Sequence, residues 1–158
     1  MVDIPGFVVR GAIRSKKTSQ RIITIPKKGA HRCHCGHLPG FPKIIPSEAH
    51  EEWHGCALRQ CFAVKRLLSV AGVELPITDK INMEALFFQD VNRSDCTGLY
   101  ESIADLLQDA QIISNDKIIE SWDGSRRLKD AVNPRVEIYI SILEEIPVQE
   151  SLLAREKV

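Results

Sequence analysis

Residues 135–143 read RVEIYISIL, and this stretch decides the fold class. Its apolar side chains occupy every second position: Val136, Ile138, Ile140, Ile142. A period of two predicts a β-strand with one buried face. Residues 80–89, KINMEALFFQ, alternate in the same way but carry apolar residues on both faces. They predict a strand that is buried on one face and partly buried on the other.

Two helices are predicted beside these strands. The first begins at Ser47, a good N-cap that follows Pro46, and ends at Gly72. The second spans about residues 97–110, with leucines and isoleucines at helical spacing. Further strands are predicted at residues 7–13, 21–25 and 117–122. The order of these elements predicts an α+β fold: a single mixed β-sheet with two main helices packed on it.

The composition is that of an ordinary globular protein. The chain has 158 residues, 44% of them hydrophobic and 27% charged, so we expect one domain over residues 1–158 with a loosely ordered tail at 147–158. No apolar stretch approaches the roughly 20 residues that span a bilayer, and the start does not resemble a signal peptide. We therefore expect a cytoplasmic protein without a membrane partner.

The formal net charge of zero conceals an uneven distribution. Residues 1–50 hold nine Lys or Arg and two acids, which leaves twelve basic and nineteen acidic residues in 51–158. A basic segment beside a group of carboxylates suits an enzyme that acts on a polyanion with the help of a metal ion. Two merely solvated faces are the alternative that the charge counts leave open.

Residues 26–46 combine Pro and Gly with a dense group of His and Cys, and predict a loop that is ordered or held by a metal. An odd count of five cysteines without a secretory signal argues against a disulfide framework. A structural Zn²⁺ would take four Cys or His ligands, here Cys33, Cys35, His50, His54. A metal-free polar loop remains the alternative.

The stretch at residues 93–119, RSDCTGLYESIADLLQDAQIISNDKII, contains the candidate catalytic acids. Asp95 precedes a helix and Asp116 stands where the chain re-enters the sheet, so we expect the two to converge on Mg²⁺. Glu101 lies one turn after Thr97 and is the preferred third acid. Asp105 would lie about 12 Å along the helix from its start near Thr97, too far from Asp95 to share a cation, so we expect it to be structural.

The same stretch resembles the signature of the RusA-type endodeoxyribonucleases, which are Holliday-junction resolvases common in phages and prophages. The residues that match the signature in register are Asp95, Leu99, Asp105, Leu107, Asp116. Residues 15–21 (SKKTSQR) and 44–53 (IIPSEAHEEW) are similar to the family's flanking segments, while WDGSRR and NPRVEIYI resemble its phage members. The resemblance covers about residues 11–142.

The resemblance implies a homodimeric, Mg²⁺-dependent enzyme, with Mn²⁺ as a substitute, that cuts branched DNA during recombination and repair in a bacterial or phage-infected cell. The cation would polarise the scissile phosphate and activate water, while Asp116 or Asp95 orients the nucleophile. The basic residues expected to contact DNA phosphates are Lys16, Lys17, Arg21, Arg126, Arg127.

The chain departs from the family pattern at four positions. Thr97 replaces the second Asp of the pattern, and Gly98 replaces its Asn. Glu101 replaces its Lys, and Asn115 replaces the first of its two paired Asp residues. We expect Glu101 to supply the missing carboxylate, with Asp90 and Asp123 as spare acids. Two other functions stay open: a junction-binding relative without catalysis, and a zinc-stabilised interaction protein. Trp53 and Trp122 are expected to pack in the core rather than stack on bases.

Overall fold

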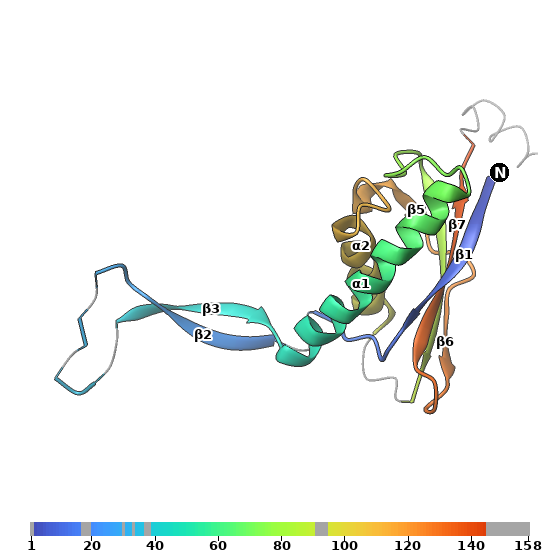
Figure 1. Ribbon diagram of the computed structural model, residues 1–158. Helices are drawn as coiled ribbons and strands as arrows, with labels where there is room; N and C mark the ends of the chain where they lie inside the picture. The colour runs from blue at the N-terminus through green and yellow to red at the C-terminus, as the bar shows by residue number, and fades with distance from the viewer. Residues whose placement is uncertain are drawn as a thin grey trace, which may run out of the picture.

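Strand β4 (Ile81–Gln89) is the centre of a five-stranded mixed sheet in the computed structural model, which describes residues 2–16, 20–29, 31–32, 34–36, 39–90 and 95–144. Strand β7 (Arg135–Ile142) pairs antiparallel with β4, and β1 (Val2–Arg10) pairs antiparallel with β7. Two short strands, β5 (Ile119–Ser121) and β6 (Arg126–Lys129), pair parallel with β4. Figure 1 shows this sheet on edge.

Both long helices lie on the same side of the sheet (Figure 1). Helix α1 (Glu48–Val70) packs against β1 and α2 (Cys96–Asp109), and the 3₁₀ helix η1 (Asp116–Ile118) follows α2. This arrangement confirms the predicted α+β class with a mixed sheet and two main helices. Within the described residues, neither of these helices nor any other is long and apolar enough to cross a membrane.

The predicted helix boundaries are confirmed to within about one residue because the capping residues act as expected. The Ser47 side chain accepts a hydrogen bond from the His50 N–H at the start of α1. Gly72, with φ +84°, follows the C-cap Ala71 and lets the chain leave the helix. Helix α2 begins with Asp95 as its N-cap.

The core lies between β4, β7 and the two helices. Strand β4 alternates buried and half-buried residues along its whole length, as predicted. Its buried side chains meet apolar residues of α2, and the cluster includes Met83, Phe87, Leu99, Ile103, Leu107, Ile138. Between β5 and β6, the Ser125 hydroxyl accepts from the Ala85 N–H at 2.9 Å and donates to the Met83 carbonyl at 3.3 Å. One side chain therefore bridges the gap between the two short strands.

A two-stranded ribbon is the main difference from the predicted fold. Strand β2 (Gln20–Pro26) was expected in the central sheet, but it pairs only with β3 (Gly40–Pro46), in residues predicted to be a loop. Prolines obscure β3 in the sequence, yet a strand with a single partner tolerates proline where the missing N–H faces the open edge. Strand β6 was missed because RRLK has no apolar alternation. The tail at 147–158 lies outside the described residues.

Cysteine labelling tests the packing of α1. Cys61 is fully buried, and its burial raises the pKa of the thiol to about 12, whereas Cys56 is exposed. Only roughly one Cys61 in ten thousand is a thiolate at pH 8, so we expect Cys56 to be alkylated in the folded protein while Cys61 reacts only after unfolding. Mass spectrometry of peptides labelled with iodoacetamide measures both. Equal labelling of the two cysteines in the native protein would contradict the buried position of Cys61.

Candidate functional site

An open groove of about 370 Å³ lies between α2 and the chain that follows it, and we call it the α2 groove. One face of α2 and the segment 116–122 line it with these residues: Thr97, Tyr100, Glu101, Ala104, Asp105, Asp116, Ile119, Trp122. The α2 residues recur three and four positions apart, so they share one side of the helix. Two of the three predicted catalytic acids, Glu101 and Asp116, therefore border one space.

Segment 116–122, which forms the wall of the groove opposite α2, is held in place by contacts with α2. The Gln108 side chain accepts a hydrogen bond from the Asp116 N–H at 3.0 Å, and Asn115 caps η1 by accepting from the Lys117 N–H. Tyr100 and Trp122 stack with ring centroids 4.3 Å apart and planes 9° apart. Burial raises the pKa of the Tyr100 phenol, so it stays neutral at physiological pH. The aromatic pair fixes one part of the groove and Gln108 fixes Asp116.

The groove is acidic, and its donor atoms suit a hard cation. Asp105 is paired with Lys16 at 3.0 Å, so its charge is offset. Glu101 and Asp116 offer carboxylate oxygens, and Mg²⁺ is usually held by one or two carboxylates plus waters and phosphate oxygens. Among the described residues, no group of three or more His, Cys, Asp or Glu is placed to bind one ion. Glu101, Asp105 and Asp116 therefore do not form a three-carboxylate site in this structure, which leaves at most two of them for one ion.

The structure does not bring Asp95 into the α2 groove. Its carboxylate accepts the Gly98 N–H at 2.8 Å as the N-cap of α2, while Asp116 is bonded to Gln108 in the last turn. Asp95 and Gln108 are separated by about 20 Å of helix rise. The chain after α2 runs back along the helix from Gln108 toward Tyr100, so Asp116 lines the same groove as Glu101 and Asp105, whereas Asp95 does not. Asp105, expected to be structural, lines the groove.

Residues 14–15, which precede β2, approach the start of α2 so closely that position 98 has little room for a side chain. A Cβ at this position would lie 2.5 Å from the Ser15 Oγ and 2.8 Å from the Asp95 Oδ1. Ser15 is buried, and Ser102 of α2 donates to the Arg14 carbonyl in the same contact at 3.2 Å. The first turns of α2 therefore pack directly on residues 14–15. An asparagine at this position would not fit without moving that segment.

A pair of glycine substitutions tests this packing. Gly98→Ala is expected to lower the free energy of unfolding by about 1–3 kcal/mol because the new methyl overpacks the contact with Ser15. Gly55→Ala, in α1, is the matched control: nothing lies within 4 Å of the added Cβ, and the change is expected to stabilise the protein by about 1 kcal/mol. Urea unfolding followed by circular dichroism measures both. A stabilising Gly98→Ala would contradict the tight contact.

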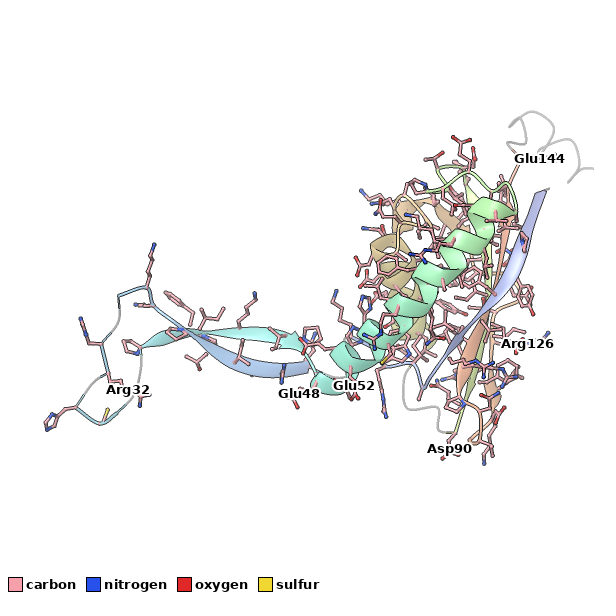
Figure 2. The ribbon with its side chains drawn as sticks, viewed as in Figure 1. Arg32, Glu48, Glu52, Asp90, Arg126 and Glu144 are labelled. Atoms are coloured by element: carbon pink, nitrogen blue, oxygen red, sulfur yellow. The ribbon has the colours of Figure 1, made fainter. Side chains whose placement is uncertain are left out.

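The predicted DNA-contacting cations fall into separate places. Lys16 is bound to Asp105, and Arg21 is paired with Glu48 and with Glu51, the latter at 2.9 Å. Arg126 and Arg127 are exposed on β6. Figure 2 shows Arg126 on the sheet, away from Glu48 at the start of α1. Lys17 lies outside the described residues. Lys16 and Arg21 thus already have carboxylate partners.

The three predicted zinc ligands that the structure describes, Cys35, His50 and His54, are not assembled. Cys35 is disulfide-bonded, which corrects the expectation of a reduced thiol there, and Cys33 lies outside the described residues. His50 Nδ1 donates to the Arg14 carbonyl at 2.8 Å, and His54 Nε2 is bonded to Asp109 at 2.9 Å. Figure 2 shows Arg32 at the far end of the ribbon and Glu48 at its base, where α1 begins. The ribbon separates the Cys-rich loop from both histidines.

The aromatic residues and Asp105 were the parts of the groove that sequence reasoning missed. Trp53 is buried as predicted, but Trp122 is only half-buried and lines the groove through its stack on Tyr100. The spacing of Thr97, Glu101 and Asp105 at i and i+4 was a signal that all three share one helix face. None of the protein-family models matches this chain, and a search of curated proteins finds no match either.

Proposed function

We propose that the chain is a Mg²⁺-dependent endonuclease that cleaves branched DNA, such as four-way junctions, in recombination or repair. The observation that carries the proposal is the shared groove of Glu101 and Asp116, two carboxylates that come from different elements. It is open to solvent and therefore to a DNA backbone. Two symmetrical cuts at a junction need two related sites, so the active species would be a homodimer.

Each residue of the α2 groove has a role in this proposal. Glu101 and Asp116 would hold the cation, and Asp116 would also orient the attacking water by accepting its hydrogen bond. Bound Mg²⁺ or Mn²⁺ supplies Lewis-acid polarisation of the scissile phosphate and lowers the pKa of its water. Lys16 offsets the charge of Asp105, which reduces the repulsion of an approaching phosphate.

The charge of the N-terminal part of the chain favours a polyanionic substrate. Residues 4–47 contain nine Lys or Arg and no Asp or Glu. Such a surplus attracts DNA without reading its sequence, and contacts to phosphates position a protein on branched DNA by shape. The acidic α2 groove and the basic front therefore have complementary roles in one nuclease.

A second candidate is a junction-binding protein without catalysis. It is favoured by Asp95, whose carboxylate is used as a helix cap, and by Thr97, which places a hydroxyl in the groove where the family has a carboxylate. A groove with two acids binds Mg²⁺ more weakly than one with three, and the phosphate oxygens of DNA would have to complete the site.

Cleavage of a labelled four-way junction separates the two candidates. The wild-type protein is incubated with the junction, with or without Mg²⁺, and with linear duplex as the control substrate. Paired, metal-dependent nicks that are confined to the junction and vanish in Asp116→Asn are expected. Binding without cleavage at every Mg²⁺ and Mn²⁺ concentration would establish the binding protein instead. If the protein neither binds nor cleaves the junction, both candidate functions are excluded.

A further inference from the structure

The β2–β3 ribbon projects from the body of the protein as an arm (Figure 1). Its strands pair over seven residues, from Gln20 opposite Pro46 to Pro26 opposite Gly40, a length of about 24 Å. Arg21, through Glu48 and Glu51, ties the base of the arm to α1. In the part of the chain that the structure describes, no helix or further strand covers either face of the arm.

The two faces of the arm differ in charge. Residues opposite each other in an antiparallel pair point to the same face. One face is therefore uncharged, and its members are Gln20, Ile22, Thr24, Pro26, Gly40, Pro42, Ile44, Pro46. Ile22 and Ile44 lie directly opposite each other and are 73% and 62% exposed. The other face holds Arg21 and Lys43 with Ile25 and Phe41.

Four cations lie along the arm from its middle to its outer end. Lys27, Lys28 and Arg32 lie beyond the paired strands, and Lys43 lies within β3. Lys27 stands over the Phe41 ring with its Nζ 5.0 Å from the centroid, which keeps the charge on the surface of the ribbon. No acidic residue occurs between 4 and 47 to offset these charges.

An isolated two-stranded ribbon with exposed isoleucines is only marginally stable in water, so its faces are suited to contact a partner. A protein partner would have to place several carboxylates along the arm to match its cations. Double-stranded DNA carries a charge about every 1.7 Å of its axis, and its major groove, about 12 Å wide, admits a two-stranded β-ribbon. The charge and the dimensions of the arm both favour DNA.

We propose that the arm enters the major groove of one duplex arm of the branched substrate, with the Ile22 and Ile44 face toward the bases and Lys27, Lys28, Arg32 and Lys43 on phosphates. Apolar side chains contact thymine methyl groups but carry little other sequence information. The arm therefore anchors a duplex beside the branch point while the α2 groove acts on the backbone. This inference rests on the proposed function, because it assigns the DNA contacts of that function.

The first test removes three cations from the arm. The variant Lys27→Ala/Lys28→Ala/Lys43→Ala is compared with Arg59→Ala/Lys65→Ala/Arg66→Ala, which removes the same charge from α1. Binding of the labelled four-way junction is measured by fluorescence anisotropy in Ca²⁺ over a range of salt concentrations. We expect the arm variant to bind about a hundredfold more weakly near 0.15 M salt, with a log–log salt slope smaller by about 3, and the control to bind nearly as the wild type does.

The second test removes the apolar face and leaves the charges. Ile22→Thr/Ile44→Thr keeps β-branched side chains and so preserves the strands. We expect affinity for the junction to fall about tenfold with an unchanged salt slope, because the lost contacts are apolar. Sedimentation measures the mass of the same variant, which we expect to equal that of the wild type. Thermal unfolding confirms that the body is intact in both arm variants.

The outcomes separate the arm from the proposed function. If the wild type binds the junction and the arm variant binds as tightly as its α1 control, the inference about the arm is overturned while the proposed function stands. If Ile22→Thr/Ile44→Thr halves the sedimenting mass, the arm covers a second copy of the chain, and the inference is again wrong. If the wild type binds no DNA, the proposed function fails and the inference fails with it.

Discussion

Replacing Glu101 with Gln is expected to reduce junction cleavage by about 10³-fold or more. The two residues have the same shape, but the amide carries no charge and cannot hold a cation in the α2 groove as the carboxylate does. With Asp95 used as a helix cap, Glu101 and Asp116 are the two predicted catalytic acids that line the groove. A bound cation supplies several kcal/mol of transition-state stabilisation, and each 1.4 kcal/mol corresponds to a factor of ten.

The matched control is Glu120→Gln on β5. Glu120 is partly exposed, is paired with Lys80 at 3.2 Å and does not line the groove. Initial rates of junction nicking are measured for both variants across a Mg²⁺ titration, with DNA binding followed in parallel. We expect wild-type rates for Glu120→Gln, and junction binding without nicking for Glu101→Gln. Full activity of Glu101→Gln would leave Thr97 or water as the ligand and would refute the role of Glu101.

Phe87→Ala is expected to lower the free energy of unfolding by about 3–5 kcal/mol. Phe87 is 1% exposed on β4, where it is the register partner of Val136. The centroids of the Phe87 and Tyr100 rings are 5.9 Å apart. Removing a buried phenyl group loses its transfer free energy and leaves a cavity that the sheet and α2 cannot close. Since domains of this size are stable by about 5–15 kcal/mol, the variant loses a large part of its stability.

Phe62→Ala on α1 is the control, because this side chain is 47% exposed and is expected to cost under about 1 kcal/mol. Urea unfolding of both variants is followed by circular dichroism in the far ultraviolet. Tryptophan fluorescence of the native Phe87→Ala protein should also change, since Tyr100 loses its support behind the Trp122 stack. Equal losses for the two phenylalanines would show that β4 is not the centre of the core.

The elements that could be predicted from the sequence are those whose burial is strongly periodic. Strand β7 alternates without interruption, and α1 is bounded by Ser47 and Gly72, whose local roles do not depend on distant residues. Strand β3 could not be predicted in the same way. It gains its hydrogen bonds from β2 alone and buries little, so no apolar period marks it. Nothing in the sequence indicates that the β2–β3 pair leaves the sheet.

The candidate site was predicted in its residues more fully than in its geometry. Glu101 and Asp116 line one groove, but the direction of the chain after α2 decides which acids meet, and that direction follows from tertiary packing. The turn after α2 brings Asp116 to Gln108 and Trp122 to Tyr100. Distances along the helix were measured from Asp95, whose carboxylate caps α2 and does not line the groove.

The arm leaves and rejoins the body at one place, since Gln20 and Pro46 are register partners whose Cα atoms are about 5 Å apart. Of the residues between them, those that the structure describes contribute nothing to the buried cluster beneath the helices. Insertions or deletions in this segment consequently change its reach without altering the spacing of β1 and α1. The length and composition of the arm can therefore vary independently of the rest of the chain, and such variation would change the reach of the DNA contacts that we propose for it.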